Sequence, residues 1–388
     1  MTQKVSLGWG RAPLTIDVPD DARIVALAPA PPARPLEELL RVALASPIGA
    51  PRLRERARGL AAEQVVVIVS DGTRDEPRRA LLEAVRDELA LPAAPTIAIA
   101  NGTHAPRPLE ELGLPSWATR VMNHDGWDDA AFVEMGQTAR GTRVRFPRWL
   151  LDAALVVATG RIRPHYFAGF GAGAKAVFPG LGQHADIRAN HLLKADPTSR
   201  LGVVSGNACR DDLEEAAQLL GVDTFLLNVV LDDDGGAQAA VAGDLQAAFR
   251  RGAEHARALF GVPVAPAAAD VVVVSARIPV AASLYQASKL LAPAAVCLRT
   301  GGVVVLAAEC HEGTGPIDTV NRGIYELGLR RLFPGAHTIY LVSSLPEALV
   351  RETYCRFADR VEDVLARHAG DVFVLPRAES LLPMAESP

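Results

Sequence analysis

Short apolar runs alternate with polar clusters and helical stretches along this chain. The runs at residues 64–69, 96–100 and 155–159 lead into SDGTR, NGTH and GRIRPH, respectively. Strands that alternate with helices of about 10 to 15 residues indicate a parallel sheet buried on both faces. Because ligands bind beyond the carboxyl ends of such strands, we expect the three polar clusters to converge on one crevice.

A second series of apolar runs follows residues 261–269, GVPVAPAAA, which we interpret as a linker because of its prolines and small residues. These runs are DVVVVSA, GGVVVLAAE, HTIYLVSS and DVFVLP, with helical stretches between them. The predicted fold class is α/β: two α/β domains with mainly parallel sheets, residues 1–262 and 270–388, and an active site in the cleft between them.

The N-terminal region carries two other patterns. VSLGWGRAPLTIDVP alternates apolar and polar residues around Gly8 to Ala12, which predicts a small amphipathic hairpin. Helical periodicity begins near Arg34 and again near Pro51.

The composition argues against several classes of protein. The 388 residues include 40 basic and 45 acidic side chains, a slightly acidic balance that argues against nonspecific nucleic-acid binding and a membrane-surface role. Four scattered cysteines suit a reducing compartment. The N-terminus has no signal-peptide core and the apolar runs are too short to span a membrane, so we expect a cytoplasmic protein.

The segment from Gly160 to His191, GRIRPHYFAGFGAGAKAVFPGLGQHADIRANH, concentrates the candidate chemistry. It places His165 and Lys175 in a glycine-rich turn, and a predicted helix with His184 and His191 follows. Residues without Cβ allow backbone N–H groups to approach a ligand closely. A Walker loop is excluded because Lys175 stands between two alanines, and the dinucleotide fingerprint lacks its third glycine.

Each candidate also has a plain structural interpretation. Asp71 could cap a helix that starts near Pro77, but Asp-Gly-Thr-Arg at a helix start also suits a phosphate or carboxylate. His104, alone, is typical of a loop residue, whereas its position at a strand end favours a catalytic role, as it does for His165. Tyr166 and Phe167 could belong to the core.

The other candidates lie further along the chain. Tyr285, Gln286 and Lys289 fall within about one helical turn and can share a face. No two histidines have the spacing of a zinc-protease pair, so a metal would need ligands from distant points or from a cofactor.

Taken together, these motifs resemble the nickel-dependent lactate racemase family. The ordered set consists of SDGTR, NGTH, PHYFAGF, a lysine ten residues after that histidine, Asn-His with its histidine sixteen residues after the lysine, and Tyr-Gln-x-x-Lys. No single motif is specific for this family, but the order and spacing of the whole set are specific for it.

The resemblance implies a racemase or epimerase of 2-hydroxy acids that uses a nickel-pincer nucleotide, pyridinium-3,5-bisthiocarboxylic acid mononucleotide nickel, made by dedicated biosynthesis enzymes. In this family, hydride is transferred to the cofactor. Two histidines, matching His104 and His165, act as acid and base. A lysine matching Lys175 tethers the cofactor, and a histidine matching His191 binds the nickel.

The resemblance assigns the remaining residues to cofactor and substrate. Asp71, Gly72 and Thr73 would lie beside the cofactor. The residues that would orient the hydroxy acid are Arg74, Tyr285, Gln286 and Lys289. Residues 1–262 would thus form the catalytic and cofactor-tethering domain.

The chemistry of the reaction agrees with such residues. The C–H bond at C2 of a 2-hydroxy acid is scarcely acidic, so removing hydride while a base takes the hydroxyl proton is the easier path. The planar keto acid can then accept hydride on either face. Imidazole suits the proton transfers because its ordinary pKa is near neutrality, and Arg74 with Lys289 suits the carboxylate.

Two departures from the family concern the substrate. The family commonly has Gly-Gly-Arg-Lys before the tether, whereas this chain has Gly-Ala-Gly-Ala-Lys175, and no tryptophan follows Trp149. Because Arg161 and Arg163 also flank the approach to His165, we expect a substrate larger or more anionic than lactate, such as malate or a sugar acid.

Two other functions stay open from the sequence. A nicotinamide-dependent 2-hydroxyacid dehydrogenase could use His104 and Arg74, although the dinucleotide fingerprint is missing. A non-catalytic nickel or nucleotide carrier is suggested only by the histidines of the central segment.

Overall fold

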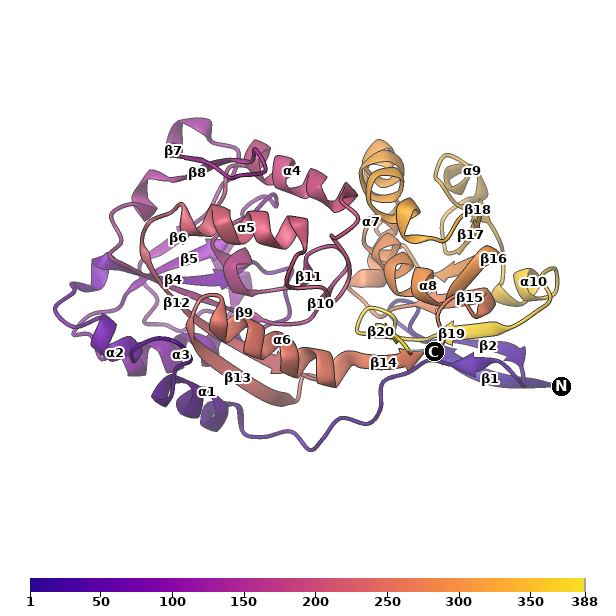
Figure 1. The fold of residues 1–388 in the computed structure, drawn as a ribbon, viewed down its shortest axis with the longest axis horizontal. Coiled ribbons are helices and arrows are strands. Elements are labelled where there is room, and N and C mark those ends of the chain that lie inside the picture. Colours follow the sequence, from indigo (N-terminus) through magenta and orange to yellow (C-terminus); the bar gives the residue numbers. More distant parts are fainter. Residues whose placement is uncertain (387–388) are drawn as a thin grey trace. The chain divides into compact units, whose positions relative to one another are not determined.

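The computed structural model describes residues 1–386 and contains two compact units. The central unit is Ala30–Leu259, and the terminal unit joins Met1–Pro29 to the chain from Phe260 onward. Each unit has a six-stranded sheet of its own (Figure 1). The prediction of α/β architecture with mainly parallel sheets is therefore confirmed.

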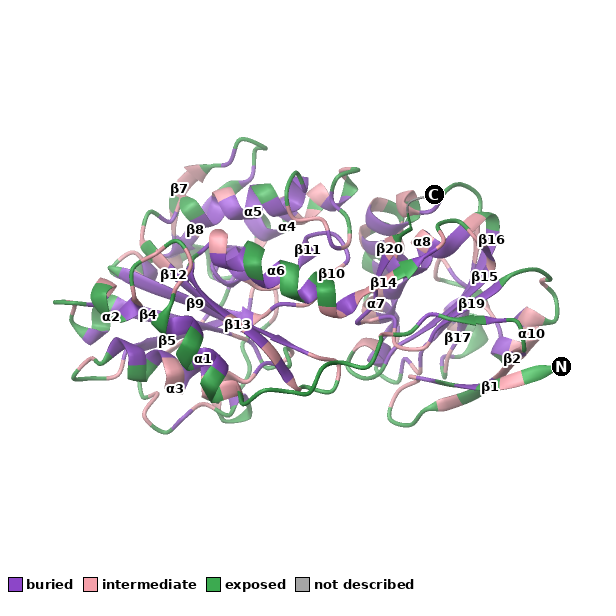
Figure 2. Ribbon diagram, turned by 60° about the horizontal axis from the view of Figure 1, so that its bottom comes forward, coloured by how far each residue is buried: buried purple, intermediate pink, exposed green. Residues whose placement is uncertain are grey.

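In the central unit, five parallel strands are extended at one edge by an antiparallel one. In spatial order the strands are β13 (Ala237–Asp244), β12 (Asp223–Leu231), β9 (Leu155–Arg161), β4 (Val65–Ser70), β5 (Thr96–Ala100) and β6 (Val121–Asn123). The middle strands consist almost wholly of buried apolar residues, which is why they sit inside the sheet (Figure 2).

Helices cover both faces of this sheet. They are α1 (Leu36–Ala45), α2 (Leu53–Arg56), α3 (Arg78–Leu89), α4 (His184–Leu192), α5 (Ala208–Gln218) and α6 (Ala247–Phe260). Figure 1 shows α1 and α3 on the side opposite α4 and α5. Alternate residues such as Val65, Val67 and Val69 pack with α1 and α3 in one core. The helix expected from Pro51 is only four residues long, with Gly59 at φ +81° shortly after it.

The sheet of the terminal unit is parallel throughout. Its order is β18 (Arg356–Phe357), β17 (Thr338–Val342), β16 (Leu298–Ala307), β15 (Ala269–Ser275), β19 (Val372–Leu375) and β3 (Arg23–Ile24). Its helices are α7 (Leu284–Ala287), α8 (Leu291–Cys297), α9 (Glu347–Val350) and α10 (Val361–Leu365), with a wider helical segment at Thr319–Leu329.

The predicted N-terminal hairpin is present, but its domain assignment is wrong. β1 (Thr2–Leu7) pairs with β2 (Leu14–Pro19), as expected. Val5, Leu7 and Ile16 are buried in the same core as β15 and β16, and β3 pairs with β19. Residues 1–29 therefore belong with the C-terminal part of the chain, because the hairpin can bury its apolar face only there.

The segment 261–269 is also more ordered than a linker. Gly261–Val264 forms β14, which pairs in parallel with β20 (Leu382–Ala385). The change of unit falls at residues 259–260, directly before this strand.

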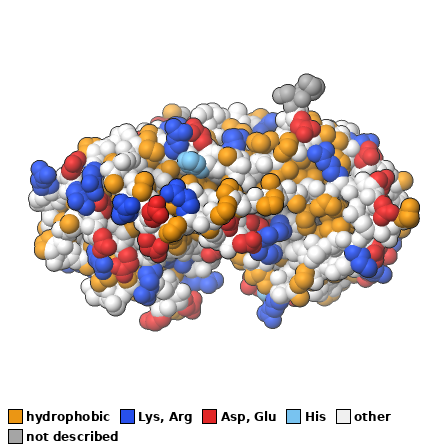
Figure 3. Space-filling model, turned by 90° about the horizontal axis from the view of Figure 1, so that it is seen from below, with side chains coloured by type: hydrophobic (Ala, Val, Ile, Leu, Met, Phe, Trp, Pro, Cys, Tyr) orange, Lys and Arg blue, Asp and Glu red, His pale blue; other side chains and the backbone are white. Residues whose placement is uncertain are grey.

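Basic and acidic side chains intermingle on the face shown in Figure 3, and no large basic area stands out there. None of the helices among residues 1–386 is both long and apolar enough to cross a membrane. A separate two-stranded ribbon, β7 (Phe132–Gln137) with β8 (Arg143–Pro147), precedes β9 in the chain.

Candidate active site

The three polar clusters follow neighbouring strands of the central sheet. β4 pairs in parallel with both β5 and β9, so the clusters after Ser70, Ala100 and Arg161 leave the sheet at the same edge. The convergence expected from the sequence is observed for two of them directly, because Nδ1 of His104 lies 2.5 Å from Oδ2 of Asp71.

Asp71 orients His104 and does not cap a helix. Its other carboxylate oxygen accepts hydrogen bonds from the backbone N–H of Thr73 at 3.0 Å and from Oγ1 of Thr73 at 2.6 Å. Helix α3 begins later, after Pro77, without a side-chain cap. Burial raises the pKa of Asp71, but the hydrogen bonds from His104 and Thr73 and the charge of Arg74 outweigh it, so the pKa lies below the ordinary value. The carboxylate is thus ionised and accepts the Nδ1 proton of His104.

Two residues that the sequence analysis missed hold the turn between β4 and α3. Buried Glu76 accepts hydrogen bonds from the backbone N–H and the hydroxyl of Ser70, at 2.7 and 2.9 Å. Arg78 donates to the carbonyl groups of Ser70, Asp71 and Arg74. Arg74 itself is exposed, so its side chain is accessible to a ligand.

His165 stands on a small ribbon, β10 (Pro164–His165) with β11 (Gly169–Phe170). Its Nδ1 accepts a hydrogen bond from the backbone N–H of Ala168 at 3.2 Å. In the neutral ring the proton is therefore on Nε2, the opposite tautomer from that of His104.

Lys175 lies in the single 3₁₀ turn Gly173–Ala176, which packs over β9 and against α5. Burial lowers the pKa of Lys175 to about 7, with further lowering by the positive charges of Arg210 and Arg74. Gly173 has φ +67°, and a Cβ there would lie 2.5 Å from the Phe249 ring. The close packing of this turn requires glycine.

Phe167 brings three of the predicted residues together. Its ring centroid lies 4.7 Å from that of His165 and 5.4 Å from that of His191, and Nζ of Lys175 lies 5.7 Å from it. Phe167 is buried, so the expectation that it could be a core residue is correct, and this core residue supports the site.

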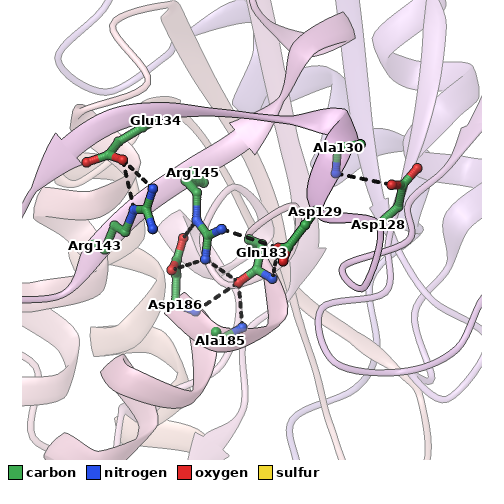
Figure 4. A network of polar contacts seen from close by, with 9 residues as sticks. All are labelled: Asp128, Asp129, Ala130, Glu134, Arg143, Arg145, Gln183, Ala185 and Asp186. Carbon is green, nitrogen blue, oxygen red and sulfur yellow. Dashed lines mark hydrogen bonds and ion pairs between the residues drawn. The ribbon is translucent and has the colours of Figure 1, made fainter.

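Helix α4, which carries His184 and His191, is fixed at its N-terminus by a polar network (Figure 4). The side chain of Gln183 caps the helix by accepting from the backbone of Ala185 and Asp186. Arg145 of β8 forms a two-pronged ion pair with Asp186 at 2.8 and 2.9 Å and donates to Gln183 at 2.7 Å. His184 stacks on Trp127 with the ring centroids 3.4 Å apart.

The predicted substrate residues of the terminal unit also form a cluster. Nζ of Lys289 lies 2.5 Å from Oε1 of Gln286 and 5.5 Å from the centroid of the Tyr285 ring. All three lie on α7 and the 3₁₀ turn Ser288–Leu290 that follows it. The hydroxyl of Ser288 lies 2.6 Å from the hydroxyl of half-buried Tyr354, and this hydrogen bond anchors the turn.

Two other polar residues of the central unit are structural. The side chain of Arg161 is 7% exposed, forms an ion pair with Asp75 at 2.7 Å and donates to the carbonyl of Asp232 at 2.8 Å. Its charge is therefore matched within the protein, contrary to the expectation that it faces the substrate. His124 is buried beside the carbonyl of Gly182, and burial lowers its pKa to about 4.

Among residues 1–386, no three His, Cys, Asp or Glu side chains are grouped closely enough to hold a metal ion. A metal bound near His191 would need most of its ligands from another molecule. The residues present thus suit a cofactor that brings its own metal ligands better than a bare ion.

An oriented histidine, a second histidine of opposite tautomer and a lysine of lowered pKa lie beyond the carboxyl edge of a parallel sheet, a combination typical of the active sites of α/β enzymes. Residues 9–202 match the family described as lactate racemase N-terminal domain. The chain therefore belongs to the lactate racemase family.

Two proteins that are similar in sequence are lactate racemases. The chain is 31% identical over 327 residues to a lactate racemase of Thermoanaerobacterium thermosaccharolyticum, covering 80% of this chain and 75% of that one. It is also 31% identical over 292 residues to a lactate racemase of Lactiplantibacillus plantarum, covering 72% and 67% of the two chains. These similarities support a racemase over the dehydrogenase and carrier alternatives.

Two solved structures resemble the whole fold. The lactate racemase apoprotein from T. thermosaccharolyticum matches with a TM-score of 0.86 and 25% identity, covering 99% of this chain and all of that one. A Thermotoga maritima protein matches with a TM-score of 0.66 and 17% identity, over 90% of this chain and 98% of that one, which shows the fold alone.

The lowered pKa of Lys175 predicts a pH-dependent change in stability. In the unfolded chain the amine has its ordinary pKa of 10.5, against about 7 in the native state. Between these values the unfolded chain binds a proton that the native chain does not, so native stability falls as the pH falls through this window and is constant below it. Lys175→Met should therefore stabilise the cofactor-free protein at neutral pH, on the order of a few kcal/mol, with no gain at high pH.

Urea unfolding between about pH 6 and pH 10.5 measures this difference. Lys4→Met, at an exposed lysine, is the control and should show little dependence on pH. An equal gain for Lys175→Met at every pH would contradict a lowered pKa.

Proposed function

We propose that this protein racemises or epimerises 2-hydroxy acids by hydride transfer with two histidine acid–bases. Two observations support the proposal: Asp71 orients His104, and His165, Lys175 and His191 gather around Phe167. The segments that carry His104 and His165 follow neighbouring parallel strands at the carboxyl edge of the central sheet.

The proposed cofactor is the nickel-pincer nucleotide, which when bound would supply an electrophilic ring as the hydride acceptor. Three features of the chain fit it. An amine with a pKa of about 7 is largely neutral at physiological pH and can be acylated, which supports Lys175 as the covalent tether. His191 can add one nickel ligand, and the exposed Gly72 leaves room beside the Asp71–Thr73 turn for the nucleotide.

The two histidines would divide the proton transfers. With Nδ1 donating to Asp71, a neutral His104 has a lone pair at Nε2 and can take the hydroxyl proton. With Nδ1 accepting from Ala168, a neutral His165 carries its proton on Nε2 and can donate a hydrogen bond to a substrate oxygen. To act as the acid it would first have to be protonated on both ring nitrogens, and it would become neutral when it gives the Nε2 proton to the substrate oxygen. In a net inversion one histidine would thus begin neutral and end protonated while the other begins protonated and ends neutral, and the reverse reaction would exchange these roles.

The substrate carboxylate requires a cationic clamp. We assign Arg74 of the central unit and Tyr285, Gln286 and Lys289 of the terminal unit to substrate binding. The contact of Lys289 with Gln286 holds its ammonium in place, so less side-chain entropy is lost when a carboxylate binds.

We further propose a cytoplasmic setting and the cofactor biosynthesis enzymes as partners. All four cysteines are unpaired and buried, which is consistent with a reducing compartment. Nucleic acid and membrane are not proposed as partners.

The first prediction concerns the two histidines. His104→Ala and His165→Ala should each lower the racemisation rate of the cofactor-loaded enzyme by at least about 100-fold in both directions, because each direction needs both a base and an acid. His255→Ala, an exposed histidine of the same unit, should leave the rate unchanged. Chiral chromatography of the product measures the rate. Near-normal racemisation by both variants would contradict the two-histidine scheme.

The second prediction concerns the substrate. The basis for an anionic substrate is weakened, because Arg161 is neutralised by Asp75; the absence of tryptophan after Trp149 still supports a larger one. We expect kcat/KM for malate or a sugar acid to exceed that for lactate. A panel of single enantiomers tests this, and a clear preference for lactate would restrict the proposal to lactate itself.

A further inference from the structure

Arg210 is a fully buried arginine that the proposed chemistry does not use. It belongs to α5, and its guanidinium donates to three alternate carbonyl groups of the loop after His165: Ala168 at 3.2 Å, Ala172 at 3.4 Å, and Phe170. Alternate carbonyls that point to one guanidinium fix the path of a backbone whose strand pairing is limited to the short β10–β11 ribbon.

The same guanidinium is packed from its other side. It lies 4.2 Å from the ring centroid of Phe249, and this is the ring that leaves no room for a side chain at Gly173. Its nearest carboxylate, Glu214, lies 3.8 Å away and is shared with Arg250. Burying a cation is costly unless its hydrogen bonds are satisfied, and here the loop carbonyls supply most of the partners.

Two neighbouring amides complete the support of the loop. Asn207, which caps α5, donates to the carbonyl of Phe167 at 2.8 Å. Asn228 of β12 accepts from the backbone N–H of Gly173 at 2.9 Å. The polypeptide from His165 to Lys175 is thus fixed by contacts from α5, α6 and β12, with Arg210 making the most of them.

We propose that Arg210 is a positioning residue that holds the loop from His165 to Lys175 in the conformation in which the neutral amine of Lys175 can condense with a thiocarboxylic acid group of the cofactor, a step that would form the C–N bond of a thioamide and release water. The inference rests on the proposed function for the identity of the acyl group. It concerns the loop and the amine of the cofactor-free chain, so it can be tested when no cofactor is bound.

The environment of Lys175 supports this role. The charged and titratable groups that act on its amine are the guanidinium groups of Arg210 and Arg74 and the thiol of Cys209. The thiol is buried and its pKa is raised to about 12, so it is neutral at physiological pH. Lys175 is half-buried, and the adjacent cation disfavours its protonation.

Competitive labelling of the cofactor-free protein with an acetylating ester tests the proposal. The chain has four lysines, so peptide mass spectrometry can follow the labelling rate of Lys175 against pH with exposed Lys4 as the internal reference. The wild type should give a midpoint near pH 7. Arg210→Gln should raise the midpoint by at least about one pH unit, because it removes a cation and frees the loop. Arg250→Gln removes a cation beside Glu214 without touching the loop and should leave the midpoint unchanged.

Arg210→Lys separates positioning from charge. Lysine keeps the positive charge but lacks the planar fork that reaches three carbonyls, so a positioning role predicts a raised midpoint in this variant as well. If Arg210→Gln does not fold, the labelling of Arg210→Lys alone tests the proposal. A folded Arg210→Lys protein whose Lys175 midpoint stays near that of the wild type would overturn the proposal. A different result would contradict the proposed function: wild-type protein made together with the cofactor that carries no adduct on Lys175.

Discussion

The candidate site depends on the segment from His165 to Lys175, whose conformation is held by hydrogen bonds from other parts of the chain. The chain from His165 to Lys175 is rich in glycine, and its regular structure is limited to the β10–β11 ribbon and the 3₁₀ turn Gly173–Ala176. Its buried carbonyl groups would be costly to bury without hydrogen-bond partners. The guanidinium of Arg210 and the amide of Asn207 donate to these carbonyl groups, and the amide oxygen of Asn228 accepts from the backbone N–H of Gly173. Helix α5 and strand β12 therefore determine where both His165 and Lys175 lie.

A consequence of this dependence is that the candidate site residues are held in place by neighbouring side chains. Phe167 contacts His165, Lys175 and His191 from within the buried interior. Asp71 holds His104 by a bond of 2.5 Å and is itself fixed by Thr73. Side chains that are already oriented lose little entropy in the reaction, which is the usual basis of efficient acid–base catalysis. The network around Arg145 serves the same purpose for the helix that carries His191.

The sequence predicted those features that are set by local pattern. Buried runs such as residues 65–69 could only be inner strands of a parallel sheet, and the polar residues after them, including His104 and His165, had to lie at one edge. Partners distant in sequence could not be predicted. Arg210 is 35 residues from Lys175 in the sequence, and nothing in the local pattern of its helix distinguishes it from an ordinary surface arginine. Residues 1–29 pack with the C-terminal part of the chain. This packing could not be predicted because their buried partners, such as Val271 and Val305, are over 240 residues away in the sequence.

The central claim is that Lys175 carries the cofactor covalently and that nickel is retained only with it. Intact-mass and nickel analysis of protein co-expressed with the cofactor biosynthesis enzymes tests this claim most directly. Wild type and Lys4→Ala should show an adduct of nucleotide size and equimolar nickel. Lys175→Ala should show neither, and His191→Ala should keep the adduct while binding nickel less firmly. An adduct that persists in Lys175→Ala, or an active protein free of both adduct and nickel, would contradict the claim.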